Sequence, residues 1–304
     1  MITIEFLFQV FVFPGLLFLL FISLLYVGIM RKLAARMQNR IGPPIWQPFL
    51  DVIKLLSKEN INPENARPGF TLWPIVALSS MLVVALMIPI FGMAPLAGSV
   101  DIIVIIYFFA LTSLAMFMAG FSSGNPFGIT GSIRGLVQIF SYEFPFVVSL
   151  VVPLIFVGTF SPAVINAYQL QTGWLAFAYP VSAVVFFLCI LAKSELPPFN
   201  VPNAHQEIVG GYTVEYTGSR YAFMEIAHAV KLFVLISLFI GLFFGGSWFG
   251  PWGAMMFIAE TLLILFILTV IKVISARVRI SQTFKVYWFL GGIVLIELIV
   301  RLLL

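Results

Sequence analysis

Three ionisable side chains recur every three residues inside a long apolar stretch of the chain. They are Glu225, His228 and Lys231, and on an α-helix this spacing places them on one broad face. An ionisable group at the centre of a membrane-spanning helix is costly, so it needs a partner, a water-filled cavity or a function. A carboxylate, an imidazole and an amine can pass a proton through intervening waters. The pattern favours a proton-relay segment; attachment of this helix to its neighbours is the alternative.

Five further carboxylates are candidates to extend such a relay. Glu143 lies in another apolar stretch without an opposite charge within one turn, so it must find its partner on a different helix. Glu260 lies in a third stretch, where a hydrogen bond between helices explains it equally well. Glu195, Glu207 and Glu215 share one loop. We interpret this loop as a partner-facing, water-filled start of the path; solvated loop charges are the alternative.

The chain supplies few ligands for a metal or a redox cofactor. It has one cysteine, Cys189, and two histidines, too few for an ordinary iron–sulfur cluster. His205 and Glu207 lie two residues apart in the acidic loop but give a metal only two ligands. We therefore predict that this chain has no catalytic residue, metal or cofactor of its own. Any redox centre is expected on a partner.

Membrane-spanning helices must position these groups. Hydrophobic residues make up 62% of the 304 residues and charged residues only 9%, against roughly 45–50% and about 25% in soluble domains. Apolar stretches of about 20 residues are expected to be helices, because lipid cannot satisfy an open backbone. The sequence predicts an all-α, polytopic membrane protein with one domain, residues 1–304, and eight transmembrane helices. The expected spans are 6–30, 71–91, 100–121, 136–160, 175–193, 222–246, 252–275 and 284–304.

The distribution of Lys and Arg predicts how these spans are oriented. Basic residues are concentrated in the segment that follows the first span and recur in every second loop, at Arg134, Lys193, Arg220, Arg277 and Arg279. The intervening loops have none: 92–99, 161–174 and 247–251. The positive-inside rule therefore places the basic segments in the cytoplasm and both termini outside. The net charge of +4 thus reflects topology, and nucleic acid is not expected as a partner.

Two longer segments, 31–70 and 194–220, are expected on the cytoplasmic side, facing partners. Between Phe49 and Leu56 an apolar stripe runs beside charged residues, which predicts an interfacial amphipathic helix. The second segment is rich in proline and glycine, so much of its backbone should be irregular. No internal repeat is visible, which argues against an autonomous transporter.

Three ordered motifs are specific enough to indicate a family. The first consists of QNRIGP at 38–43 and KLLSKE at 54–59. The second consists of GSIRG at 131–135 and SYEFP at 141–145, and the third of PFNVP at 198–202 and EYTG at 215–218. The motifs are spread over most of the chain, and together they resemble the H subunit of NADH-quinone oxidoreductase, the respiratory complex I family.

The resemblance implies a subunit that anchors a peripheral redox arm and forms much of the membrane-side cavity for an electron acceptor. It also implies the start of a polar path towards ion-pumping, antiporter-like subunits. Glu143, Glu207 and Glu215, with Arg134 beside them, would begin this path. The cavity border and the contact with the peripheral arm would involve Arg36, Arg40, Lys54, Lys58, Arg134 and His205.

Some positions depart from the quinone-type pattern. Asn203 and His205 stand where that loop is usually acidic, and His228 replaces an acid of the sixth span. Lys231 and the compact loops are more similar to the membrane-bound hydrogenase and sulfane-sulfur reductase complexes. The prediction is therefore a subunit of such a complex in the cell membrane, which couples electron transfer from ferredoxin to H⁺ or Na⁺ translocation. A quinone-site H subunit, an autonomous ion transporter and a purely structural anchor are the alternatives.

The expected partners follow from that prediction. They are peripheral iron–sulfur subunits, a hydrogenase-like or other large catalytic subunit, antiporter-like membrane subunits, membrane lipid and, indirectly, ferredoxin.

Overall fold

The structure is a computed structural model that describes residues 4–96, 102–246 and 250–303. The regular elements in these ranges are helices, and the only strand-like pairing there is one bridge between Ile90 and Met93. The elements are α1 (Ile4–Phe11), α2 (Leu16–Met37), α3 (Gln47–Leu56), α4 (Leu72–Met87), α5 (Ile102–Ser122), α6 (Pro126–Val157), α7 (Pro162–Thr172), α8 (Leu175–Ala178), α9 (Pro180–Lys193), α10 (His205–Ile208), η2 (Gly211–Thr213), α11 (Gly218–Phe243), α12 (Pro251–Ile274) and α13 (Ile280–Leu303). The all-α prediction is confirmed.

Within the described residues, 6 helical segments are long and apolar enough to cross a membrane. They are the run Glu5–Met37, which contains most of α1 and all of α2, then α5, α6, α11, α12 and α13. Two predicted spans correspond to shorter apolar helices, α4 with 16 residues and α9 with 14. The predicted first span is not one regular helix, because Pro14 lies between α1 and α2 and proline cannot donate a helical hydrogen bond.

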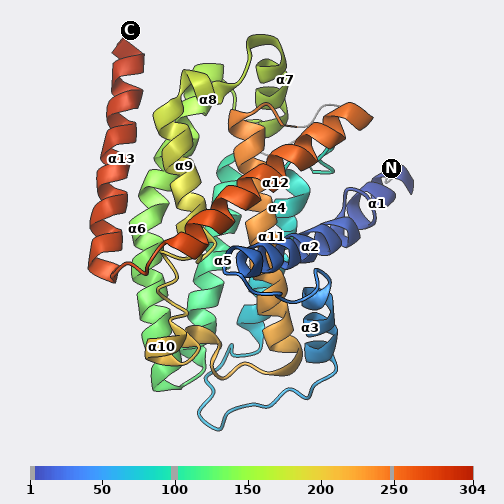
Figure 1. The fold of residues 1–304 in the computed structure, drawn as a ribbon, viewed down its shortest axis with the longest axis vertical. Helices are drawn as coiled ribbons and strands as arrows, with labels where there is room; N and C mark the ends of the chain where they lie inside the picture. The colour runs from blue at the N-terminus through green and yellow to red at the C-terminus, as the bar shows by residue number, and fades with distance from the viewer. Residues whose placement is uncertain (1–3, 97–101, 247–249, 304) are drawn as a thin grey trace.

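Helix α11 forms the centre of the bundle. Every residue from Ala229 to Phe243 is buried, because α2, α3, α4, α9 and α12 pack around it. On one side α13 lies against α6 and α9, while α2 and α12 cross the bundle obliquely (Figure 1). Helices α3 and α10 lie at one end of the molecule, and α7, α8 and the C-terminus lie at the other (Figure 1).

The structure differs from the sequence prediction at several helix boundaries and in the assignment of Lys193 and of the loop 161–174. Helix α6 begins at Pro126, ten residues before the predicted span at 136, so Arg134 lies on a helix and not in a loop. The Asn125 side chain caps this helix by accepting a hydrogen bond from the Phe127 backbone N–H at 2.8 Å. Lys193 is the buried last residue of α9, not a loop residue, and α7 occupies most of the predicted loop 161–174.

Two glycines allow the loop between α9 and α11 to press against α5 and α6. A Cβ on Gly120 would lie 2.3 Å from Cβ of Tyr212, and a Cβ on Gly131 would lie 2.7 Å from Cα of Gly211. Any larger residue at these positions would displace η2. The glycines of the helices therefore determine where Tyr212 lies.

Tyr216 fastens the end of this loop. Its hydroxyl donates to the carbonyl oxygens of Phe70 at 3.1 Å and Ala119 at 2.9 Å, and its ring stacks on Phe70 with centroids 4.3 Å apart. Burial raises the pKa of the Tyr216 phenol to about 12. The phenol therefore remains a neutral donor at physiological pH.

Candidate functional site

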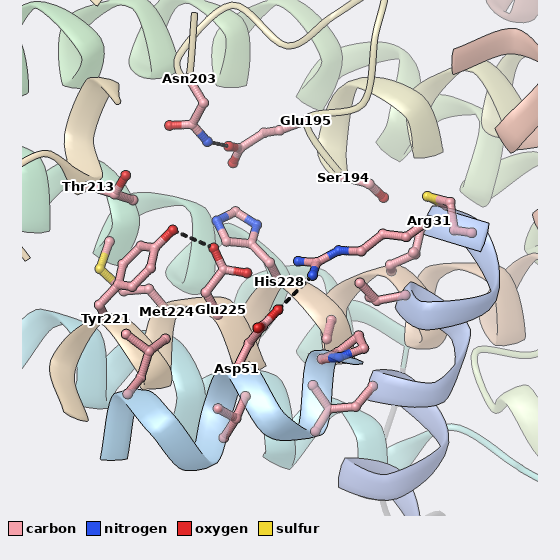
Figure 2. A pocket seen from close by; sticks show the side chains of 18 of the residues that line it. Arg31, Asp51, Ser194, Glu195, Asn203, Thr213, Tyr221, Met224, Glu225 and His228 are labelled. Carbon is pink, nitrogen blue, oxygen red and sulfur yellow. Dashed lines mark hydrogen bonds and ion pairs between the residues drawn. The ribbon is translucent and has the colours of Figure 1, made fainter. Parts of the chain in front are cut away.

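A cavity of about 570 Å³ lies between α2, α3, α11 and the start of the loop that follows α9. Its polar wall, much of it drawn in Figure 2, consists of Arg31, Asp51, Lys54, Lys58, Ser194, Glu195, Asn200, Asn203, Thr213, Tyr221, Glu225, His228 and Lys272. Lys54 and Lys58, predicted at the cavity border, are among these residues. Arg36 and Arg40 are exposed and lie outside the lining.

Two contacts fix the wall of this cavity (Figure 2). Arg31 on α2 and Asp51 on α3 form an ion pair at 2.9 Å, which holds α3 against the bundle. The Tyr221 hydroxyl donates to Glu225 Oε1 at 2.8 Å. Glu225 is thus part of the cavity wall, one turn away from His228.

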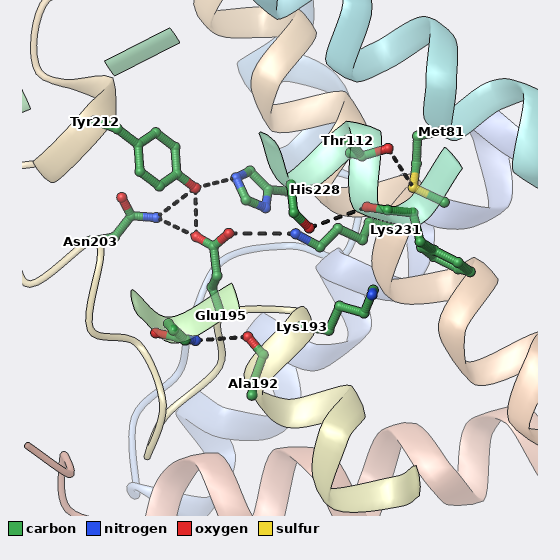
Figure 3. Close-up of polar contacts among 12 residues, drawn as sticks. Met81, Thr112, Ala192, Lys193, Glu195, Asn203, Tyr212, His228 and Lys231 are labelled. Carbon is green, nitrogen blue, oxygen red and sulfur yellow. Dashed lines mark hydrogen bonds and ion pairs between the residues drawn. The ribbon is translucent and has the colours of Figure 1, made fainter. Parts of the chain in front are cut away.

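Glu195 is the centre of a hydrogen-bonded network beside the cavity (Figure 3). The Tyr212 hydroxyl donates to Glu195 Oε2 at 2.5 Å, and its oxygen lies 2.7 Å from His228 Nε2. Asn203 Nδ2 donates to Glu195 Oε2 and to the Tyr212 hydroxyl, both at 3.1 Å. Lys231 Nζ approaches Glu195 Oε1 at 3.5 Å. Because the single phenol proton goes to Glu195, the imidazole Nε2–H is the donor to Tyr212.

The electrostatics of the loop residues agree with these roles. Burial alone would raise the pKa of the Glu195 carboxyl, but His228, Lys231 and the Tyr212 hydrogen bond together hold that pKa below its usual value. Burial, together with the Glu195 carboxylate, raises the pKa of the Tyr212 phenol well above its usual range. Glu195 is therefore an ionised acceptor and Tyr212 a neutral donor.

Another ion pair joins α9 to α6. Lys193 Nζ, at the end of α9, donates to Glu143 Oε2 on α6 at 2.9 Å. Glu143 thus has its opposite charge on another helix. Tyr142, the neighbour of Glu143, donates from its hydroxyl to Ser113 Oγ on α5 at 3.2 Å.

The remaining predicted site residues lie apart from this network. Glu207 pairs with Arg134, and Glu215 accepts from the Asn125 amide, so both acids tie the loop to the start of α6. The Glu260 carboxylate lies on α12, with one buried oxygen that has no hydrogen-bond partner in the described part of the chain. The His205 side chain lies outside the described residues.

Three residues of these contacts were not predicted as site residues. Asn203 was noted only as a departure from the acidic pattern of the loop, and Tyr212 was not singled out, since only the fold brings them to Glu195. Lys193 directly follows the apolar run of α9, which was the one signal that it could belong to the membrane helix. In the described ranges, no group of three or more His, Cys, Asp or Glu side chains could hold a metal ion.

The fold and the site define a helical membrane protein built around buried ionisable groups beside a cavity at one end. The chain belongs to the NADH dehydrogenase family, whose profile matches residues 10–302. It is 32% identical over 278 residues to the H subunit of NADH-quinone oxidoreductase from Protochlamydia amoebophila, with 85% of each chain covered. It is also 32% identical over 299 residues to the same subunit of Bacillus cytotoxicus, covering 91% of this chain and 89% of the relative.

A solved structure gives the same relationship. A chain of the membrane-bound sulfane sulfur reductase, described as an archaeal respiratory membrane complex, superposes with a TM-score of 0.85 at 27% identity. The match covers 93% of this chain and 96% of the other. The resemblance drawn from the three motifs is confirmed: this is a membrane subunit like the H subunit of complex I, structurally close to the chain of the sulfur reductase complex.

Proposed function

We propose that this chain couples electron transfer from ferredoxin, in an attached redox arm, to translocation of H⁺ or Na⁺. In this proposal it anchors peripheral iron–sulfur and hydrogenase-like or other large catalytic subunits, which carry all the redox cofactors, and it contacts antiporter-like membrane subunits. Its relatives are subunits of respiratory membrane complexes, which supports assembly into such a complex.

The observation that carries the proposal is the network on Glu195. His228 lies at the cavity wall. When a proton from the cavity binds its Nδ1, its Nε2 proton can move to the Tyr212 oxygen while the phenol proton moves to Glu195, so that the imidazole ends neutral and Glu195 protonated. Lys231 then loses its counter-charge. A proton taken up at the cavity thereby becomes a change of charge inside the bundle, which is the event that ion translocation requires.

The proposed placement has eight spans in the cell membrane with both termini outside. Helices α4 and α9 would be the two further spans, because 16 and 14 residues reach about 24 and 21 Å at 1.5 Å per residue, and α8 lengthens the second. Helix α3 would lie at the cytoplasmic surface, since Leu50, Ile53 and Leu56 on it are exposed apolar residues. This puts the cavity and the acidic loop on the side of the redox arm.

A quinone site is the second candidate function. The curated relatives are named for quinone, the cavity of about 570 Å³ is within the range of small-molecule sites, and Tyr221 and His228 could hydrogen-bond a carbonyl oxygen. A ferredoxin-linked complex would use the same cavity without quinone. Activity with each acceptor distinguishes the two.

The first test is purification of the tagged chain in mild detergent, with mass spectrometry of the proteins that co-purify. Oxidation of reduced ferredoxin is then measured with protons, polysulfide or quinone as acceptor. Iron–sulfur and antiporter-like subunits with quinone-independent activity are the expected result. A requirement for quinone favours the second candidate, and a chain that purifies alone yet moves ions in vesicles would be a transporter.

The substitution Glu195→Gln tests the coupling itself. In vesicles containing the whole complex we expect electron transfer to continue while ion uptake is lost, because the amide cannot accept the proton from Tyr212. Glu64→Gln is the matched control, since Glu64 is an exposed carboxylate outside the network. Unchanged ion uptake in Glu195→Gln would contradict the coupling role and would favour a purely structural anchor.

A further inference from the structure

Lys193 is a cation enclosed by aromatic rings. Lys193 is 0% exposed. Its Nζ lies 4.0 Å from the ring centroid of Phe146, 5.2 Å from that of Tyr142 and 5.4 Å from that of Phe109. All three distances are within the range of cation–π attraction. The rings come from α5 and α6, so two helices form a cage for the charge at the end of α9.

The cage gives the ammonium one direct anionic partner. Lys193 Nζ contacts Glu143 Oε2, while the other carboxylate oxygen of Glu143 is buried and has no hydrogen-bond partner among the described residues. Glu143 Oε1 is therefore the oxygen that is free to bind a proton. That protonation would leave the Lys193 charge without its counter-ion among apolar rings, which is unfavourable.

The second ion pair, Lys231 with Glu195, lies close to the first. Figure 3 shows the side chains of Lys193 and Lys231 next to each other, and the two ammonium groups are close enough to repel. The Lys231 contact is longer, 3.5 Å against 2.9 Å, and Glu195 also accepts hydrogen bonds from Tyr212 and Asn203. Glu195 is thus the one carboxylate in this region with several donors, whereas Glu143 depends on Lys193 alone.

We propose that Lys193 is a positioning residue that keeps Glu143 ionised at rest, so that Glu143 takes up a proton only when the Lys193 ammonium moves away from it. This rests on the proposed function and deepens it. Glu143 would accept a proton only after the Lys193 ammonium has moved, and would not be available to protons at all times. The other ionisable groups that act on this pair are Tyr142, Cys189 and Lys231. The proton taken up would bind Glu143 Oε1, with no other bond made or broken.

The test is infrared spectroscopy of the intact complex carrying Lys193→Met. This change keeps an unbranched side chain, one atom shorter, and removes its charge, so we expect a carboxylic-acid C=O band in the resting complex that the wild type lacks. The band should disappear in the double variant Lys193→Met/Glu143→Gln and be absent in Lys193→Arg. Lys285→Met, at an exposed position on α13, is the matched control and should give no band.

The outcomes separate this inference from the proposed function, since the infrared measurement needs no ion translocation. A Lys193→Met complex without the band, or a wild type that already shows it, overturns the role of Lys193 whatever Glu195→Gln does. If Lys193→Met or Glu143→Gln alone fails to assemble, the double variant should assemble better, because it removes both buried charges together. In that case, a double variant that assembles no better than the failing single variant overturns the inference.

Discussion

At the scale of residues, Glu195 joins three separate segments through one carboxylate. Tyr212 comes from η2, Asn203 from the extended loop and Lys231 from α11. A buried carboxylate is tolerated only when donors satisfy it. The network therefore stabilises the loop against the bundle, and this role depends on the phenol of Tyr212.

Tyr212→Phe is predicted to destabilise this region by about 1.5–3 kcal/mol at pH 7, the usual worth of a hydrogen bond to a charged group. Because the folded state lowers the pKa of Glu195, its stabilising effect is present above the ordinary carboxyl pKa and is lost as the pH falls through the lowered value. In Tyr212→Phe the pKa of Glu195 is lowered less, because the hydrogen bond from the phenol is missing. The difference from wild type should therefore shrink below about pH 4.

Thermal unfolding of the purified complex between neutral and acid pH measures this difference. Tyr107→Phe, at an exposed tyrosine on α5, provides the control and should behave as wild type throughout. A Tyr212→Phe deficit of equal size at every pH would mean that the lost interaction is packing and not the hydrogen bond to an ionised Glu195.

At the scale of elements, the first turns of α6 connect the membrane helix to the acidic loop. Asn125 caps α6 through its side-chain oxygen and donates through its amide to Glu215. Asn125→Ala should cost about 1 kcal/mol, which corresponds to roughly fivefold faster amide exchange in the first turn of the helix. Hydrogen–deuterium exchange of the peptide that contains residues 126–130 measures it.

Asn125→Asp separates the two roles of this residue. Aspartate still caps the helix, so the exchange of the first turn should stay close to wild type, while its charge repels Glu215 and loosens the loop. Faster exchange confined to the loop is the expected pattern. Equal acceleration of both segments in Asn125→Asp would contradict the assignment of the cap to the side-chain oxygen.

The positions of most helices could be predicted from the length of the apolar stretches, because a stretch that is buried in lipid must be apolar throughout. The start of α6 could not be predicted in this way. Its first turns pack against the protein loop, with Gly131 against Gly211, and need not be apolar. Lys193 was assigned to a loop for a related reason: its compensation comes from Glu143, Phe109 and Phe146, far away in the chain. Pairings between distant segments carry no signal in local composition.

At the scale of the whole molecule, the proposed side of each loop follows from the number of spans between them. Three apolar helices separate α3 from α7, namely α4, α5 and α6, and three separate α7 from the loop before α13, namely α9, α11 and α12. If α4 or α9 failed to cross, the loops on its two sides would face the same compartment. The two shortest apolar helices therefore decide the topology.

Single-cysteine labelling is the measurement that tests this topology. The one native cysteine, Cys189, is buried, so wild type should label little with a membrane-impermeant maleimide. Ser57→Cys after α3, Thr172→Cys in α7 and Ala276→Cys before α13 are exposed positions. In intact cells we expect only Thr172→Cys to react, with the other two reacting after permeabilisation. Labelling of Ser57→Cys together with Thr172→Cys would mean that α4 does not span, and labelling of Ala276→Cys with Thr172→Cys would mean the same for α9.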